Sequence, residues 1–147
     1  RLETINKFYF GYSFSIKEIL FIWTMLFINL ILIINFFLKT FWGRARPGDV
    51  LELGGKDIFS SWYQISDACT SNCSFVSGDA AVGFSLIVLY IVSNNLKYVY
   101  LSIIFGFILG LIRIAEGGHF LSDVIFSAII VFLFSFIIKK FFLNKFL

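Results

Sequence analysis

Charged residues are scarce in this chain of 147 residues: Asp, Glu, Lys and Arg make up 14% of it, whereas hydrophobic residues make up 59%. In soluble domains about a quarter of the residues are charged. The shortage excludes an ordinary soluble domain, and the mean hydropathy of +0.92 predicts a polytopic membrane protein. The net charge of +3 does not indicate nucleic acid binding, because the basic residues do not cluster on a polar face.

Histidine and cysteine are also rare. A single histidine, His119, and two cysteines, Cys69 and Cys73, make a poor zinc site, because structural zinc takes four such ligands. Both cysteines lie in one polar loop, where an oxidising compartment would favour a small disulfide. Two free thiols are the alternative that the sequence leaves open. Residues 1–15 lack the charged, apolar and small-residue order of a cleavable signal.

Long apolar runs, by contrast, are abundant. Four segments are each roughly long enough for a membrane helix of about 20 residues, and they cover residues 19–38, 77–95, 98–115 and 120–138. We expect one all-α transmembrane bundle over residues 1–147, with these four membrane helices and an N-terminal interfacial or partial helix. In the third segment, Gly106 and Gly110 form a small-xxx-small pattern, which predicts close packing against a neighbouring helix of the same chain.

The lysines predict how the bundle lies in the membrane. One end of the segments carries Lys17, Lys97, Lys139, Lys140 and Lys145, and the positive-inside rule makes this end cytoplasmic. The opposite end carries Lys39, Arg44, Arg46, Asp79, Arg113, His119 and Asp123. Positive charge on the outside opposes the rule, and a bound anion would explain it. Arg44 is interpreted as an interfacial charge, and Glu116 as a structural partner of an arginine.

The stretch from Arg113 to Asp123 places ionisable residues between two apolar runs. Such groups are costly near lipid and therefore indicate function. His119 and Asp123 are four residues apart, which predicts that they lie on one face of a helix, with the carboxylate leaning toward the imidazole. This pattern predicts a nucleophile or base rather than a core histidine.

Three stretches predicted to converge at that end favour a phosphate site. Lys39, Arg46 and Arg113 would surround a phosphate, which carries about −1.5 to −2 charges at neutral pH. Ser77 and Gly78 open a predicted helix, where free backbone N–H groups bind anions.

These residues, in the order Lys39-x6-Arg46-Pro47, Ser77-Gly78 and Arg113-x5-His119-x3-Asp123, resemble the type 2 phosphatidic acid phosphatase (PAP2) superfamily. Its members include membrane lipid phosphatases, and vanadium haloperoxidases share the site. The resemblance covers roughly residues 39–123 and implies the last four of six family helices. The local sequences around Ser77 and His119 are similar to those of bacterial lipid A phosphatases. A halide substrate is disfavoured because so hydrophobic a chain indicates a lipid substrate.

The resemblance implies a role for each of these residues. Lys39, Arg46 and Arg113 bind the phosphoryl oxygens, and Ser77 and Gly78 add hydrogen bonds. His119 attacks phosphorus to form a phosphohistidine, and Asp123 orients the histidine. The implied activity is that of a phosphoric ester hydrolase without metal or other cofactor. It acts on a lipid phosphate monoester or pyrophosphate at the periplasmic face of a bacterial inner membrane.

The sequence departs from the family at Asp79, where most members have a histidine that protonates the leaving alcohol. A carboxylate beside a phosphate must carry or share a proton to avoid repulsion, whereas a helix N-terminus favours the anion. We predict that Asp79 donates this proton, with a helix cap as the alternative role. Ile112 also replaces a serine that many members have.

Two other functions compete with hydrolysis. A lipid-to-lipid phosphotransferase would pass the phosphoryl group from His119 to an acceptor lipid. A non-catalytic protein would only bind anionic headgroups, which the loss of the family's second histidine at Asp79 favours. The expected partners are a phosphorylated lipid and the bilayer, without nucleic acid, and the sequence leaves a homo-oligomer open.

Overall fold

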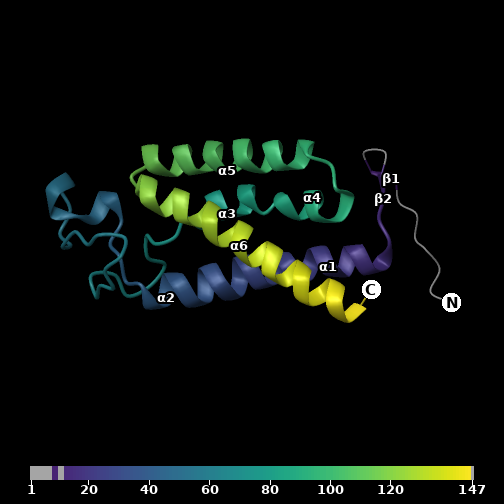
Figure 1. Ribbon diagram of the computed structural model, residues 1–147. Helices are drawn as coiled ribbons and strands as arrows, with labels where there is room; N and C mark the ends of the chain where they lie inside the picture. Colours follow the sequence, from purple (N-terminus) through teal and green to yellow (C-terminus); the bar gives the residue numbers. More distant parts are fainter. Residues whose placement is uncertain (1–7, 10–11, 147) are drawn as a thin grey trace.

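Helices make up most of the computed structural model, which describes residues 8–9 and 12–146 (Figure 1). In chain order the elements are β1 (Phe8–Tyr9), β2 (Tyr12–Ser13), α1 (Ile16–Leu26), the π-helix η1 (Phe27–Leu38), α2 (Lys39–Phe41), the 3-10 helices η2 (Pro47–Asp49) and η3 (Leu51–Leu53), α3 (Gly78–Phe84), α4 (Ile87–Ser93), α5 (Lys97–Ala115) and α6 (Leu121–Phe146). Apart from the short hairpin of β1 and β2, the predicted all-α class is confirmed.

Within the described residues, three helices are long and apolar enough to cross a membrane: Ile16–Phe41, Lys97–Ala115 and Leu121–Phe142. Large apolar side chains on these helices point outward; Trp23, Phe36 and Leu133 are each more than half exposed. Apolar surface of this extent is typical of a surface that contacts lipid. The chain is therefore an integral membrane protein.

The expected fourth membrane helix is broken. Residues 78–93 form two short helices, α3 and α4, which together are shorter than a membrane span. At the break, the Ser85 hydroxyl donates to the Val82 carbonyl at 2.6 Å, and the Leu86 amide bonds three residues back, to Gly83. A serine that bonds a carbonyl of the preceding turn competes with the helical ladder and bends the helix.

The expected N-terminal helix is not confirmed either. The described residues before Ile16 include the strands β1 and β2, and the rest of that prediction falls on residues 1–7 and 10–11, which lie outside the described part. Helix α1 begins with a capping box: the Ser15 hydroxyl accepts from the Glu18 amide, and the Glu18 carboxylate accepts from the Ser15 amide. This pair satisfies two amides that the first helical turn leaves free.

The two glycines of α5 pack against neighbouring helices, as their spacing predicts. A Cβ atom on Gly106 would lie 2.2 Å from the Phe84 ring of α3, and one on Gly110 would lie 2.4 Å from Val124 of α6. Gly83 of α3 approaches Gly106 equally closely, since its Cβ would lie 2.6 Å from the Gly106 Cα. Helix α5 therefore holds α3 and α6 at backbone distance.

The loop of residues 43–76 folds back over one end of the bundle, where the α5–α6 turn also lies (Figure 1). Gly43, at φ +63°, lets the chain turn sharply there, and a Cβ atom on it would collide with the Ser66 carbonyl. Trp42 stacks on Phe75, and Trp62 packs against Phe126 with its ring tilted by 30°; these contacts hold this loop against the helices.

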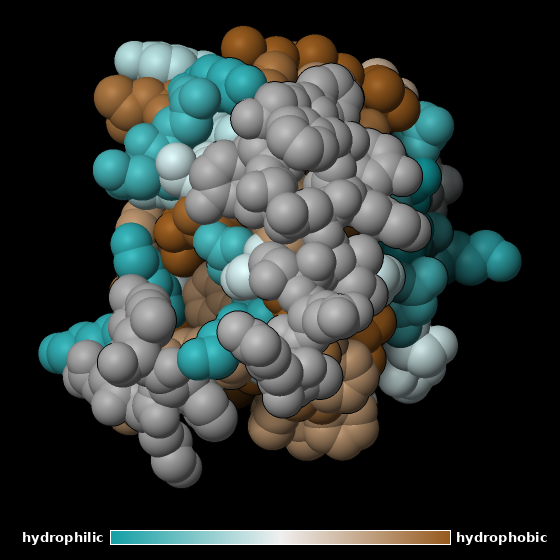
Figure 2. All heavy atoms as spheres, turned by 90° about the vertical axis from the view of Figure 1, so that its right-hand side faces the viewer, coloured by the Kyte–Doolittle hydropathy of each residue, from teal (hydrophilic) through white to brown (hydrophobic). Residues whose placement is uncertain are grey.

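The predicted segregation of lysines is seen in the fold. Helix α1 begins, α4 turns into α5, and α6 ends at the end opposite the long loop, which places Lys17, Lys97, Lys139 and Lys140 there (Figure 1). Figure 2 views this end and shows hydrophilic residues around it. That this end faces the cytoplasm stays a prediction from the positive-inside rule.

We expect Gly106→Ala to lower the stability of the protein by about 1–3 kcal/mol, because the added methyl group overlaps the Phe84 ring. Thermal unfolding in detergent measures this change. Leu111→Ala is the control, since that side chain of the same helix is 58% exposed and faces outward. An unchanged melting temperature for Gly106→Ala would show that α3 and α5 do not approach this closely.

Candidate functional site

His119 lies in the turn just before α6 and is only 1% exposed. Its Nδ1 atom lies 2.7 Å from the Ser74 carbonyl oxygen. A carbonyl only accepts hydrogen bonds, so Nδ1 must carry the hydrogen, and in the neutral ring Nε2 then carries the lone pair. Nε2 is buried and has no hydrogen-bond partner among the described residues. The structure thus presents a nitrogen with a free lone pair in a fixed orientation.

Asp123 lies close to this histidine, as predicted, but the two do not sit on one helix face. His119 precedes the first residue of α6, so the two do not share a helix face, and the closest approach of Nδ1 to the carboxylate is 3.7 Å. The carboxylate instead accepts from the Ser74 hydroxyl at 2.6 Å and from the Phe120 amide at 2.9 Å. Asp123 therefore holds Ser74, whose carbonyl holds the histidine.

Arg44 is the partner of Asp123, and its interpretation as an interfacial charge was wrong. Its Nη1 atom lies 2.5 Å from the Asp123 carboxylate, and both side chains are almost fully buried. Arg44 also donates to the Ser60 carbonyl and the Ser122 hydroxyl and lies over the Phe120 ring. One signal in the sequence could have identified this pair: a buried carboxylate needs a cation, and Arg44 had no other role at that end.

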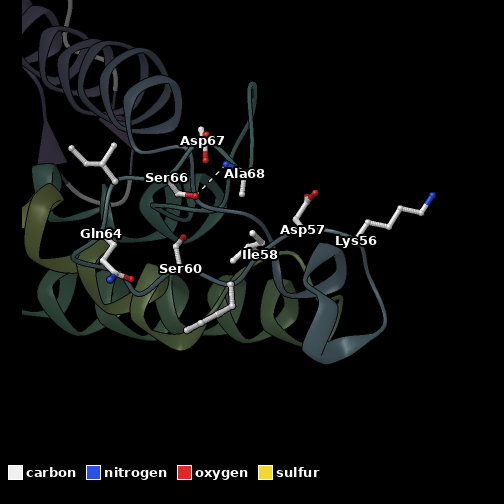
Figure 3. Close-up of a pocket in the computed structure, with 10 residues that line it drawn as sticks. Lys56, Asp57, Ile58, Ser60, Gln64, Ser66, Asp67 and Ala68 are labelled. Atoms are coloured by element: carbon white, nitrogen blue, oxygen red, sulfur yellow. Dashed lines mark hydrogen bonds between the residues drawn. The ribbon is translucent and has the colours of Figure 1, made fainter.

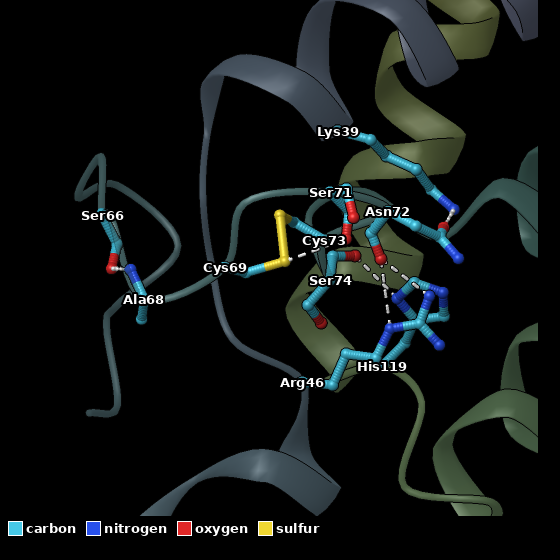
Figure 4. Close-up of a disulfide and its surroundings, with 10 residues drawn as sticks. All are labelled: Lys39, Arg46, Ser66, Ala68, Cys69, Ser71, Asn72, Cys73, Ser74 and His119. Carbon is cyan, nitrogen blue, oxygen red and sulfur yellow. Dashed lines mark hydrogen bonds between the residues drawn. A yellow bond between two sulfur atoms is a disulfide. The ribbon is translucent and has the colours of Figure 1, made fainter. Parts of the chain in front are cut away.

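Lys39 and Arg46, the predicted phosphate ligands, meet at Asn72, a residue that the sequence reasoning missed. The Lys39 ammonium donates to the Asn72 side-chain oxygen at 3.1 Å. Arg46 donates to the Asn72 backbone carbonyl from Nη2 at 2.8 Å and from Nε at 3.3 Å. Figure 4 shows both side chains reaching this residue close to His119.

Cys69 and Cys73 form a disulfide beside these contacts, with their Cα atoms 5.6 Å apart (Figure 4). Of the two states that the sequence left open, the structure has the oxidised one. Asn72 lies inside the small ring that this bond closes.

Ser77 and Gly78 begin α3 next to the cations. The Ser77 hydroxyl accepts from the Ala80 amide as the helix cap, which leaves its hydrogen to donate. The Ser77 amide donates to the Asp123 carbonyl, and the Ser127 hydroxyl of α6 donates to the Ser77 carbonyl. A Cβ atom on Gly78 would lie 3.3 Å from the Lys39 ammonium nitrogen, so a glycine leaves room for the lysine.

Arg113 pairs with two carboxylates. Its Nε atom lies 3.0 Å from Asp79, and its Nη1 atom lies 2.5 Å from Glu116, the structural pairing expected for that residue. The Asp79 contact is an ion pair without a hydrogen bond, because no acceptor among the described residues is well aligned with the Arg113 Nε hydrogen. Ser77 rather than Asp79 caps α3.

The structure therefore brings the predicted residues to one end of the bundle. Lys39 lies within electrostatic reach of Arg46, Asp79 and Arg113, and Ser74 links the histidine to the same loop. In such an arrangement, an imidazole nitrogen can attack a phosphate, and cations at the same end can stabilise the charge that develops in the transition state.

A separate pocket of about 720 Å³ lies within the long loop (Figure 3). Polar side chains line much of it, namely those of Lys56, Asp57, Ser60, Gln64, Ser66 and Asp67. None of the predicted site residues lines this pocket. It is joined to them through the Ser60 carbonyl, which Arg44 binds.

Comparisons with known proteins identify a family and named relatives of the chain. The family model of the PAP2 superfamily matches residues 18–147. The chain is 40% identical to a lipid A 4'-phosphatase of Francisella tularensis subsp. novicida, over 88% of the chain and 59% of the relative. It is 35% identical to lipid A 4'-phosphatases of Rhizobium leguminosarum and Rhizobium etli, over 73% of the chain and 48% and 44% of those relatives. The chain thus spans about half the length of these curated relatives. No solved structure matches it.

We expect Arg44→Ala to destabilise the protein by about 3–5 kcal/mol, because it leaves the buried Asp123 carboxylate without a cation. The control is Arg113→Ala, whose ion pairs are partly exposed and should contribute less than about 1 kcal/mol. Thermal unfolding in detergent compares the two variants. An equal loss of stability in the two variants would show that the buried Arg44–Asp123 pair stabilises the protein no more than the partly exposed pairs of Arg113.

Proposed function

The chain belongs to the PAP2 superfamily, and from this premise we propose that it removes phosphate from a phosphorylated membrane lipid through a phosphohistidine at His119. The observation that carries the proposal is the state of the imidazole. Its Nδ1 atom is fixed by the Ser74 carbonyl, while Nε2 is buried and has no partner among the described residues, at the end of the bundle where Lys39, Arg46 and Arg113 also lie. A core histidine would normally have both nitrogens satisfied.

The proposed reaction has two steps. In the first, the Nε2 lone pair attacks phosphorus, the bond from phosphorus to the lipid oxygen breaks, and that oxygen takes a proton. In the second, water attacks phosphorus, the N–P bond breaks, and inorganic phosphate leaves. Nδ1 keeps its hydrogen bond to Ser74 throughout, so the positive charge of the phosphorylated imidazole lies near the Arg44–Asp123 pair.

Lys39, Arg46 and Arg113 would bind the phosphoryl oxygens, and the Ser77 hydroxyl and Gly78 amide would add hydrogen bonds. Preorganised cations stabilise the charge of the transition state without reorganising at the moment of reaction. They would supply the charge that a metal ion supplies in other phosphatases, which is why we propose a reaction without metal.

The substrate is proposed to be a lipid A-like phosphate, since the curated relatives carry the name lipid A 4'-phosphatase. The active end would face the periplasm, because it lies opposite the lysine-rich end. A bacterial inner membrane fits both points. A phosphotransferase would use the same first step and would differ only in the acceptor, which is a lipid instead of water.

We expect the protein in detergent with EDTA to release inorganic phosphate from lipid phosphates, and His119→Ala to reduce the release to the uncatalysed rate. Phosphate assays of both proteins, with equal melting temperatures as the folding control, measure this. Release that needs an added acceptor lipid would favour the phosphotransferase. Binding of lipid phosphates without any turnover would favour the non-catalytic function.

Asp79 is proposed to protonate the leaving lipid oxygen, after the substrate phosphate has taken over its contact with Arg113. We expect Asp79→Asn to slow release from an alkyl or sugar phosphate by about 10²–10⁴-fold, the usual contribution of a general acid. Release from p-nitrophenyl phosphate should fall far less, because nitrophenolate leaves without a proton.

Parallel assays of the two substrates test this role, with Asp49→Asn as the control on an exposed carboxylate of the loop of residues 43–76. An equal loss on both substrates would instead assign Asp79 to orienting Arg113.

A further inference from the structure

We infer that Asn72, held in place by the Cys69–Cys73 disulfide, is a positioning residue that gathers Lys39 and Arg46 for the substrate phosphate without neutralising them. The inference rests on the proposed function for the identity of the ligand. The contacts themselves are those of the structure: one residue accepts from both cations, through its side chain and through its backbone.

The contacts leave donors for a ligand. A guanidinium has five N–H groups, and Arg46 uses two of them on the Asn72 carbonyl. An ammonium has three, and Lys39 uses one of them on the Asn72 amide oxygen. The Nη1 hydrogens, one Nη2 hydrogen and two ammonium hydrogens remain, which suits a tetrahedral oxyanion with several acceptor oxygens.

Lys39 and Arg46 differ from Arg44 and Arg113, the other cations of the site, in the charge of the groups that they contact. Arg44 pairs with Asp123, and Arg113 pairs with Asp79 and Glu116. In the described part of the chain, Lys39 and Arg46 have no carboxylate within 4.0 Å, and the acceptors that Asn72 offers are neutral. Two like charges repel, so neutral acceptors can bring them together while their full charge stays available to a phosphate dianion.

The surrounding chain explains why Asn72 can hold this position. It adopts φ +49°, a left-handed conformation that asparagine tolerates better than most residues. The disulfide closes the ring around it, Cys73 is fully buried, and the Cys69 amide donates to the Gly43 carbonyl. Two residues further on, Ser74 holds His119. One short stretch therefore positions both the cations and the nucleophile.

Two substitutions of Asn72 distinguish the effect of its neutral charge from the effect of its contact with Lys39. Asn72→Asp keeps the shape and strengthens the Lys39 contact, yet adds a negative charge between the cations. We expect it to weaken the binding of inorganic phosphate by about tenfold or more, with no loss of melting temperature. Asn72→Gly keeps the left-handed backbone and the carbonyl but loses the Lys39 contact, so we expect a smaller, severalfold loss.

Binding is measured as the concentration of inorganic phosphate that protects the protein from thermal unfolding and as its inhibition constant in turnover. The matched control is Asn94→Asp, because Asn94 is also left-handed, at φ +52°, but lies at the α4–α5 turn at the opposite end. If Asn72→Asp binds phosphate as well as the wild type, neutrality has no role and the inference is wrong.

The disulfide is tested separately. The chain has only two cysteines, so a reductant such as TCEP acts on this bond alone. We expect reduction to weaken phosphate binding severalfold, and the double variant Cys69→Ser, Cys73→Ser to show the same weakening without any response to reductant. Unchanged binding in both would overturn the role of the disulfide in holding Asn72.

These measurements distinguish the inference from the proposed function. Protection by inorganic phosphate does not depend on turnover. If the wild type, Asn72→Gly and Asn72→Asp rank in phosphate binding as expected but the wild type releases no phosphate from lipids, only the proposed function is refuted. Turnover with variants that bind phosphate equally would refute only the inference. A wild-type protein that inorganic phosphate does not protect would also count against it.

Discussion

The buried ion pair between Arg44 and Asp123 is the interaction on which the rest of this end of the molecule depends. Removing two charges from water is costly, and the cost is recovered only where the geometry is good and the remaining polar atoms have partners. Here the Ser74 hydroxyl and the Phe120 amide donate to the Asp123 carboxylate, and the Ser60 carbonyl accepts from Arg44. The pair joins the long loop to the first turn of α6, and Ser74 extends it to the imidazole. The orientation of His119 is therefore tied to the folding of the loop.

The cations at this end form a graded series. Arg44 is buried and fully paired, and Arg113 is partly exposed and shares two carboxylates. Among the described residues, Lys39 and Arg46 have only neutral partners. Uncompensated positive charge attracts an anion, whereas compensated charge holds structure. The distribution thus separates the arginine that holds the structure at this end from the lysine and arginine that we propose bind the phosphate. It also explains positive charge at the end opposite the lysine-rich one.

The membrane imposes a second constraint, through the broken helix. Backbone groups freed by a break are costly in lipid and are tolerated only where protein surrounds them. The break at Ser85 meets this condition: Phe84 and Ile87 are buried, Ser102 of α5 donates to the Phe84 carbonyl, and Ser85 bonds Val82. The close approach of Gly83 and Gly106 allows α5 to cover α3. At its start, next to Ser77, α3 lies close to Lys39, because a Cβ atom on Gly78 would lie 3.3 Å from the Lys39 ammonium nitrogen.

By itself the sequence determined the membrane class, three of the helices, the lysine-rich end, the glycine packing and which polar residues gather at the opposite end. These follow from local pattern: apolar length, charge placement and the spacing of three polar motifs. Only the tertiary structure decided the partners. His119 Nδ1 bonds the Ser74 carbonyl at 2.7 Å and lies 3.7 Å from Asp123. Arg44 pairs with Asp123, and Asn72 binds both Lys39 and Arg46. The reason is physical: such contacts join residues far apart in the chain, and which polar atoms meet depends on how the long loop folds back, which spacing along the sequence does not encode.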